Sequence, residues 1–175
     1  MKEEEIIRVF SSGFNRELTI NQVAKLIKKS YAFTNTTVHQ LINEGILKRR
    51  IIGSSILCSL NLASEKAIAF LVFNSIGRTN GFMKSLDDTK RKKLLELTRE
   101  LENHPILTAY LVGSEVNVVT QDKSQIKLAQ KSFKTKIMSK SEFESIVKSI
   151  DFPKMIIIHN HERFWRLMSK SVWFS

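Results

Sequence analysis

The stretch that decides the fold is "TNTTVHQLINEGILKRR", residues 34–50. Val38, Leu41 and Ile42 recur at spacings of three and four, which predicts a helix with one buried side. Gly45 follows at the position where a left-handed residue commonly ends a helix. A short run rich in apolar and basic residues comes next. We therefore expect a helix that ends at a glycine and leads into a basic strand.

Two further helices are predicted before this stretch. Residues 3–10 place Ile6, Ile7 and Phe10 at helical spacing. The segment "RELTINQVAKLIKKS" (16–30) predicts a second helix with Asn21 as its N-cap. The apolar side of that helix is expected to carry Val23, Ala24, Leu26 and Ile27. "SYAF" (30–33) is expected to form the turn to the next helix.

A β-hairpin is predicted after the third helix. Residues 46–52 and 55–61 are rich in strand-forming side chains, and "GSS" between them is a turn signal. Two helices, a turn, a third helix and a basic hairpin follow one another in the order of a winged helix-turn-helix. We expect residues 1–62 to form such a domain.

The middle of the chain is predicted to be helical. Ser64 precedes an apolar helix over 65–76, "GRTNGF" (77–82) predicts a break, and a second helix is expected over 88–103. We interpret residues 63–104 as a helical linker. The apolar helix 64–76 is the candidate surface for a homodimer.

From residue 105 onward, strands and helices alternate. Strands are expected at 106–113, 115–120, 133–138 and 154–160. Ser139 and Glu142 form a capping-box pattern ahead of one helix, and a last helix is expected from residue 161. Residues 105–175 are therefore predicted to form a small α/β domain. The fold class expected for the whole chain is α+β.

The composition narrows the class of partner and the compartment. The formal net charge is +11, which favours an anionic partner, and nucleic acid is the commonest. Cys58 is the single cysteine, so no internal disulfide is expected and a reducing compartment suits the chain. The most apolar run, "AIAFLVF" (67–73), is too short to span a bilayer. We expect a cytoplasmic protein without a membrane partner.

The winged-helix interpretation predicts contacts with double-stranded DNA. A helix fits the major groove, where polar side chains bond to base edges. Phosphates are contacted from the turn before the helix and from the basic strand after it. The residues expected to face base edges are Asn35, Thr36, Thr37, His39 and Gln40; those expected at phosphates are Ser30, Tyr31, Thr34, Lys48, Arg49 and Arg50.

A second basic site is predicted in the later part of the chain. Lys123, Lys127 and Lys131 are spaced by four, so on a helix they share one face. Lys134 and Lys136 extend the group. Like charges at this spacing repel one another, so we expect an anionic partner such as a phosphate backbone, which could be that of RNA.

"HNHE" (159–162) permits two interpretations. His159 and His161 could bind a metal with Glu162, or the four residues could form a polar corner between a strand and a helix. We favour the corner and predict no metal.

Several of these segments resemble one known family. "KSYAFTNTTVHQLINEGILKRRIIGSSILCSLNL" (29–62) resembles the N-terminal winged helix of a set of archaeal proteins. In that family, the winged helix precedes a small nucleotidyltransferase domain of the DNA polymerase beta superfamily. "ILTAYLVGS" (106–114) is similar to the family's first strand, which ends in a Gly-Ser pair, here Gly113 and Ser114. "KIMSKSEFESIV" (136–147) and "HERFWRLM" (161–168) resemble its later strand and helices.

The chain departs from this family at the metal site. Active members follow Gly-Ser with Arg-Gly and then with an Asp-x-Asp pair, whose carboxylates hold two Mg²⁺ ions. The aspartates of this chain are Asp87, Asp88, Asp122 and Asp151, so no such pair exists. The resemblance therefore implies a degenerate domain with no catalytic residue and no cofactor.

Three hypotheses follow from the sequence. The leading one is a non-enzymatic DNA-binding protein, a transcriptional regulator that binds DNA as a homodimer. The second is a nucleotidyltransferase with an atypical metal site built from Glu115 and Asp122. The third is an RNA-binding or antitoxin-like adaptor that uses the second basic site.

Overall fold

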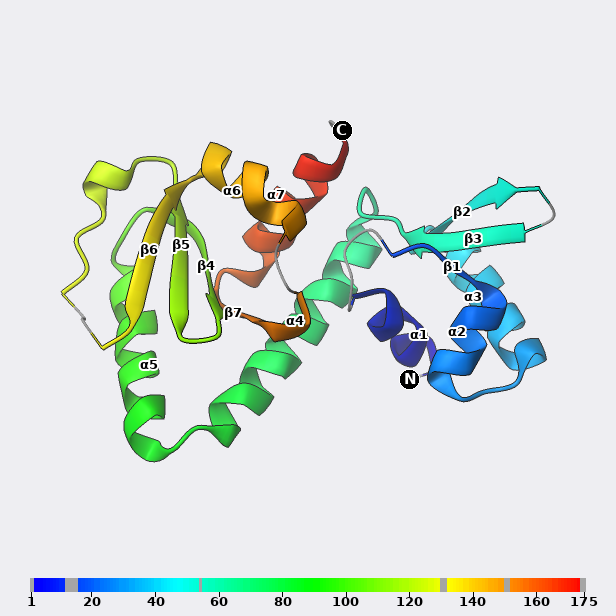
Figure 1. Ribbon diagram of the computed structural model, residues 1–175, viewed down its shortest axis with the longest axis horizontal. Coiled ribbons are helices and arrows are strands. Elements are labelled where there is room, and N and C mark those ends of the chain that lie inside the picture. The colour runs from blue at the N-terminus through cyan, green and yellow to red at the C-terminus, as the bar shows by residue number, and fades with distance from the viewer. Residues whose placement is uncertain (1, 12–15, 54, 130–131, 150–151, 174–175) are drawn as a thin grey trace. The chain divides into compact units, whose positions relative to one another are not determined.

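The computed structural model describes residues 2–11, 16–53, 55–129, 132–149 and 152–173. It has a mixed α+β fold, as expected from the sequence. The chain divides into two compact units, Met1–Leu71 and Val72–Ser175, which we call unit 1 and unit 2 (Figure 1). The division falls inside one helix, α4 (Glu65–Ser85).

Unit 1 combines three helices with a small antiparallel sheet. Its elements, in chain order, are α1 (Lys2–Ser11), β1 (Leu18–Thr19), α2 (Ile20–Ile27), α3 (Tyr31–Asn43), β2 (Leu47–Ile52) and β3 (Ser55–Leu60). The strand order is β1-β3-β2, and both pairs of neighbours are antiparallel. The hairpin expected from the sequence is confirmed. The short strand β1, which the sequence analysis did not predict, adds a third strand.

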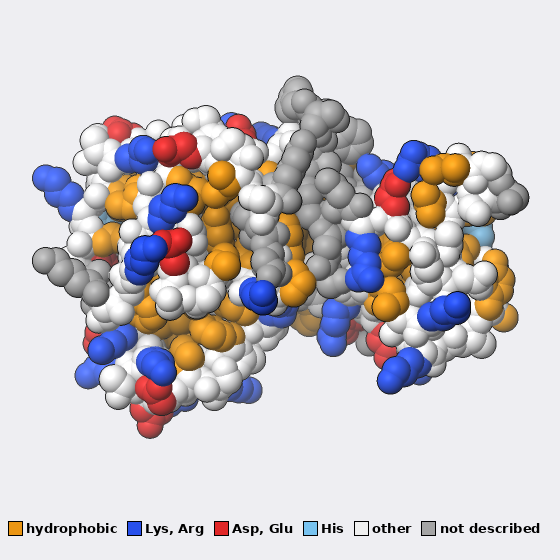
Figure 2. Space-filling view, in the orientation of Figure 1, with side chains coloured by type: hydrophobic (Ala, Val, Ile, Leu, Met, Phe, Trp, Pro, Cys, Tyr) orange, Lys and Arg blue, Asp and Glu red, His pale blue; other side chains and the backbone are white. Residues whose placement is uncertain are grey.

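The core of unit 1 lies between the three helices and the base of the hairpin. Ile6, Ile7 and Phe10 are buried in α1, which confirms the helical spacing expected there. Leu47 of β2 and Cys58 of β3 are buried at the base of the hairpin. Further out, the hairpin carries basic and hydrophobic side chains next to one another on its surface (Figure 2).

Helix α2 begins earlier than predicted. Thr19, and not Asn21, is its N-cap: the Gln22 backbone N–H donates to Thr19 Oγ1 (3.3 Å), and the Thr19 backbone N–H donates to Gln22 Oε1 (2.8 Å). The buried residues of this helix are Ile20, Val23 and Ala24. Leu26, which was expected on the apolar side, is 48% exposed.

Helix α4 runs through the predicted break at 77–82, so that prediction is wrong. A glycine inside a helix costs only about 1 kcal/mol relative to alanine, and tertiary contacts override such a cost. Here Arg78 Nη2 donates to the carbonyl oxygens of Phe152, Pro153 and Met155 at 2.8–3.1 Å. Thr79 Oγ1 also donates to the carbonyl oxygen of Ile157 (2.5 Å). These contacts, all within unit 2, hold the helix in place.

Unit 2 is built around a four-stranded mixed sheet. Its strands are β4 (Ile106–Val112), β5 (Glu115–Thr120), β6 (Lys134–Ser139) and β7 (Met155–His159), in the order β6-β5-β4-β7. Strand β4 is antiparallel to β5 and β7, whereas β5 and β6 are parallel. Its complete helices are α5 (Asp88–Glu102), α6 (Lys140–Ile146) and α7 (His161–Trp173).

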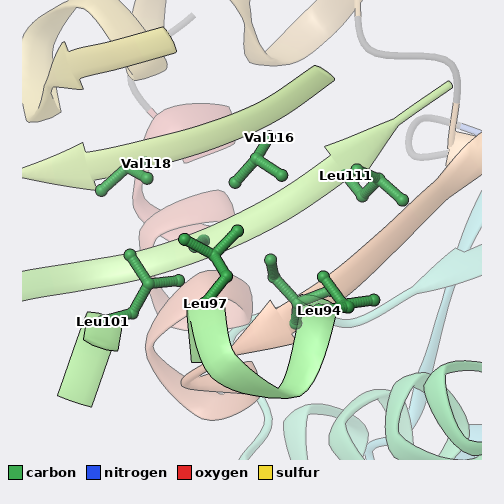
Figure 3. Close-up of a cluster of buried hydrophobic side chains, with 8 residues drawn as sticks. Leu94, Leu97, Leu101, Leu111, Val116 and Val118 are labelled. Atoms are coloured by element: carbon green, nitrogen blue, oxygen red, sulfur yellow. The ribbon is translucent and has the colours of Figure 1, made fainter. Parts of the chain in front are cut away.

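Helix α5 covers one face of this sheet. Its leucines at 94, 97 and 101 are buried and point at the side chains of Leu111, Val116 and Val118 (Figure 3). The opposite face carries an aromatic cluster in which Tyr110, Phe143 and Phe164 meet edge to face at 5.6–6.0 Å. Helix α5 is therefore part of the core of unit 2.

The capping box predicted from Ser139 and Glu142 is confirmed. The Glu142 backbone N–H donates to Ser139 Oγ (3.2 Å), and the Ser139 backbone N–H donates to Glu142 Oε2 (2.5 Å).

Within the described residues, no helix combines the length and the apolar character needed to cross a membrane.

Candidate nucleic-acid interface

Helix α3 begins at Tyr31, about one helical turn before the start that is expected if "SYAF" (30–33) forms a turn. Ser30 is its N-cap and accepts a hydrogen bond from the Phe33 backbone N–H (3.3 Å). Tyr31 therefore lies in the first helical turn, where its side chain is 52% exposed. Gly45 follows the helix with a φ of 73°, in the left-handed region predicted for it.

Two predicted DNA contacts are buried. Thr34 and Thr37 are 0% and 6% exposed, and they line the inner side of α3 together with Val38 and Leu41. Their hydroxyls donate to the carbonyl oxygens one turn earlier, at Ser30 (2.9 Å) and Phe33 (3.0 Å). The expectation that both threonines are exposed is therefore wrong, because the buried side of α3 includes them as well as its aliphatic residues.

The outer side of α3 keeps the other predicted contacts. Thr36 and Gln40 are exposed, and Asn35 and His39 are half-buried. They occupy positions 35, 36, 39 and 40, which share one helix face. Gln40 Nε2 donates to Glu44 Oε1 (3.0 Å), so this amide already has a partner within the helix.

Strand β2 presents Lys48, Arg49 and Arg50, all exposed. Side chains alternate between the two faces of a strand. Lys48 and Arg50 therefore lie on one face, and Arg49 lies on the other, opposite the buried Cys58. Positive charge thus reaches both faces of the hairpin. Burial raises the pKa of the Cys58 thiol, while nearby Arg49 opposes this shift.

Arg50 is paired with an acid that the sequence analysis overlooked. Its Nε donates to Glu17 Oε1 (3.2 Å), and its Nη2 donates to Glu17 Oε2. The hydrogen bond from Arg50 lowers the pKa of the Glu17 carboxyl, and the same bond raises the pKa of Arg50. Glu17 precedes β1, 33 residues from Arg50, so no local pattern indicates the pair.

A depression of about 240 Å³ lies beside this helix and hairpin. Its lining comes from the start of α2, the outer side of α3 and strand β3: Thr19, Ile20, Asn21, Tyr31, Asn35, Ser55 and Ile56. Two of the predicted contact residues, Tyr31 and Asn35, therefore share one concave surface with the hairpin.

The second basic site does not have the predicted form. Lys123 begins a 3₁₀ turn of three residues, and residues 126–129 are not helical, so Lys123 and Lys127 share no helix face. Lys131 lies outside the described residues. Lys123 Nζ pairs with Glu142 (2.8 Å), and Lys134 Nζ pairs with Glu115 (2.9 Å). Acids distant in sequence thus balance part of the predicted positive charge.

Lys134 and Lys136 have a structural role that the sequence did not indicate. Both are exposed on β6, which is an edge strand of the unit 2 sheet. Lysines on an edge strand discourage pairing with the strands of other molecules. Lysines at this position can therefore serve the fold itself, without a nucleic-acid partner.

Gly113 and Ser114 form the two-residue turn between β4 and β5, with Val112 paired directly to Glu115. Gly113 has a φ of 60°, which suits glycine. No helix begins at this turn.

The acids of the enzyme hypothesis are not brought together. Glu115 and Asp122 flank opposite ends of β5, a strand that spans about 17 Å. Hydrogen bonds from Ser124 and Gln125 hold the pKa of the Asp122 carboxyl below its usual value. Among the described residues, no group of three or more His, Cys, Asp or Glu side chains is placed to hold a metal ion.

"HNHE" lies at the corner between β7 and α7. Asn160 has a φ of 50° and accepts a hydrogen bond from the Arg163 backbone N–H at Oδ1 (3.2 Å). His161 Nδ1 lies 2.8 Å from Ser75 Oγ, which also accepts a hydrogen bond from the buried Trp165 Nε1 (3.3 Å). Burial lowers the pKa of His161 to about 4, and the neighbouring His159 contributes to the shift.

Comparison with protein-family models, with curated proteins and with solved structures found no match.

Proposed function

We propose that unit 1 is a winged helix-turn-helix domain that binds double-stranded DNA. The observation that carries this proposal is the placement of two features in one compact unit. The outer side of α3 is polar, and the exposed strand β2 carries Lys48, Arg49 and Arg50 on both of its faces. The order of helices and strands in unit 1 supports the same assignment.

The proposed mechanism divides the contacts between base edges and phosphates. Helix α3 enters the major groove with Asn35, Thr36, His39 and Gln40 toward the bases. Lys48 and Arg49 contact phosphates, while Arg50 must first exchange its bond to Glu17 for a phosphate. Residues 16–60 hold seven Lys and Arg against two acids, so their local charge also favours DNA.

A non-enzymatic role in transcription fits unit 2 better than nucleotide transfer. The nucleotidyltransferase-like character of residues 105–175 remains a prediction. The Gly113–Ser114 turn leads directly into β5, and the nearest acid, Glu115, is paired with Lys134. Neither feature provides the paired carboxylates that two Mg²⁺ ions need.

A homodimer belongs to the same proposal. One helix contacts too few base pairs for high specificity, and two copies would contact two half-sites. Phe73 and Ile76 of α4 are 62% and 42% exposed, in the segment expected to join two chains.

The proposal is tested by titrating a labelled random-sequence duplex with the full-length protein and two triple variants. The first variant changes Lys48, Arg49 and Arg50 to Ala. The second removes the same charge from exposed lysines of unit 2, through Lys92→Ala, Lys127→Ala and Lys136→Ala. We expect the hairpin variant to lose roughly 100-fold or more in affinity at about 100 mM salt, and the control variant to lose far less.

The same titration distinguishes the alternatives. Equal losses in the two variants would mean that net charge, and not the hairpin, determines binding. Stronger binding to an RNA of the same length would favour the RNA-binding adaptor. The stoichiometry at saturation reports whether two chains bind together.

A further inference from the structure

The tip of the hairpin carries two exposed isoleucines. Ile51 and Ile52 end β2 and are 66% and 49% exposed. Gly53, with a φ of 59°, begins the turn that follows. Strand β2 is an edge strand of its sheet, and all of its residues after Leu47 are exposed. Ile51 and Ile52 each contribute less to the core than a fully buried isoleucine, because about two thirds of the Ile51 surface and about half of the Ile52 surface remain in water.

Each isoleucine lies just beyond a cation on its own face of the hairpin. Ile51 shares a face with Arg49, and Ile52 shares the opposite face with Lys48 and Arg50. Residues two apart on a strand are separated by about 7 Å. Both faces therefore change from positive to aliphatic along the same short distance toward the tip.

A partner for this surface must carry negative charge at its rim and apolar surface within. Duplex DNA has this arrangement: phosphates line the edges of each groove, and the stacked bases lie between them. β-ribbons enter DNA grooves, and aliphatic side chains inserted between base pairs unstack and kink the duplex. Positive charge beside the tip matches the phosphates that such an insertion approaches.

We propose that Ile51 and Ile52 form an apolar wedge that enters duplex DNA between base pairs and bends it. This inference rests on the proposed function of unit 1 and specifies which DNA it prefers. Insertion is easiest at flexible pyrimidine–purine steps and at mismatches, and hardest in stiff A-tracts. The protein then selects deformable sites at base pairs that α3 does not contact.

The test uses the full-length protein and duplexes of about 30 base pairs with a fluorophore at each end. The central step is a TA step, a mismatch or an A-tract. The variant carries Ile51→Thr and Ile52→Thr, since threonine keeps the branched Cβ that suits a strand but removes the aliphatic surface. The matched control is Leu26→Gln, which removes an exposed aliphatic side chain of α2 in the same unit.

If the isoleucines act as a wedge, the wild-type protein and the Leu26→Gln control bring the two ends of the duplex closer together. They should bind the TA and mismatch duplexes about tenfold more tightly than the A-tract duplex. The threonine variant should still bind with an unchanged salt dependence, because no cation is lost. Its bend should disappear, and its preference should fall to about twofold or less.

Two other outcomes would overturn the wedge. The first is wild-type binding without bending, or an unchanged bend in the threonine variant; the proposed function would survive that result. The second combines two results: DNA stays unbent, and phosphatidylglycerol vesicles bind the wild-type protein but not the threonine variant. That outcome would assign the tip to a membrane surface. If the wild-type protein binds none of the duplexes, the proposed function fails as well.

Discussion

Arg50 shows how a single contact changes the contribution of a basic residue. The sequence places it beside Lys48 and Arg49 as an equal member of a phosphate-contacting group. In the structure, Glu17 holds both its Nε and one terminal nitrogen. The charge of Arg50 is therefore already neutralised by Glu17 in the free protein. In the proposed complex, a DNA phosphate must displace the Glu17 carboxylate before it can bind Arg50. Exposed pairs of this kind add little to the stability of the fold.

We expect Glu17→Gln to tighten binding to any duplex by roughly three- to tenfold at about 100 mM salt. The change removes a negative charge and leaves Arg50 available to a phosphate, so the salt slope should steepen by about one. The measurement is a salt series on a random duplex. Glu144→Gln, which releases Lys140 in unit 2 in the same way, is the matched control. An equal gain in the control would indicate a general charge effect.

We expect His161 to make the stability of unit 2 sensitive to acid. Burial and the neighbouring His159 lower its pKa from 6.5 to about 4, so it is neutral in the folded chain at neutral pH. Its Nδ1 lies 2.8 Å from Ser75 Oγ, in a contact that also involves Trp165. Between pH 6.5 and pH 4, the unfolded chain binds a proton at this position and the folded chain does not.

We expect this difference to destabilise the fold as the pH falls through that window, by up to about 3 kcal/mol of unfolding free energy. His161→Asn keeps an amide near the position of Nδ1 but cannot titrate. Urea unfolding at neutral and mildly acidic pH should therefore show a smaller acid loss in the variant. Equal losses in the two proteins would mean that His161 has the same protonation in the folded and the unfolded chain.

Among the elements, α4 keeps two glycines inside a helix, and Arg78 and Thr79 between them hold the helix through contacts with residues 152–157. A Cβ added at Gly77 or at Gly81 would meet no atom within 4 Å, and neither residue has a positive φ. Nothing within the described chain therefore requires glycine at these positions.

We expect Gly77→Ala and Gly81→Ala each to stabilise the protein by about 0.5–1 kcal/mol, because alanine loses less backbone entropy on folding. Chemical denaturation of the single and double variants measures this gain. A loss of stability in either variant would indicate that another part of the protein, or a second copy, packs against the glycine.

Elements with strong local signals were predictable from the sequence. The hairpin has a turn signal between two β-rich runs, and the capping box at Ser139 needs only the residues it contains. The start of α3 was missed because the aromatic residues after Ser30 were assigned to a turn. Thr34 and Thr37 were expected to be exposed because only the aliphatic residues Val38, Leu41 and Ile42 defined the expected buried side of this helix. The lysine group was misjudged because helical spacing was assumed where the chain is not helical.

For the whole molecule, the net charge of +11 can be counted from the sequence. Which basic side chains form ion pairs with acids of the same chain cannot be inferred from it. Ion pairs such as Arg50–Glu17 and Lys123–Glu142 join residues that are 33 and 19 positions apart. No pattern in a single sequence reveals these pairs. The Lys123–Glu142 pair balances positive charge in unit 2, and the Arg50–Glu17 pair balances positive charge on the hairpin of unit 1. We place the proposed DNA binding in unit 1 because β2 exposes Lys48, Arg49 and Arg50, and the outer side of α3 in the same unit is polar.

The most direct test of this assignment is to photo-crosslink the full-length protein to a duplex that carries bromouracil at many positions, and then to identify the linked peptides by mass spectrometry. If unit 1 binds DNA as proposed, crosslinks form within residues 31–52, from the outer side of α3 to the tip of β2. Crosslinks confined to residues 123–140 would contradict the proposal and would move the nucleic-acid site to unit 2.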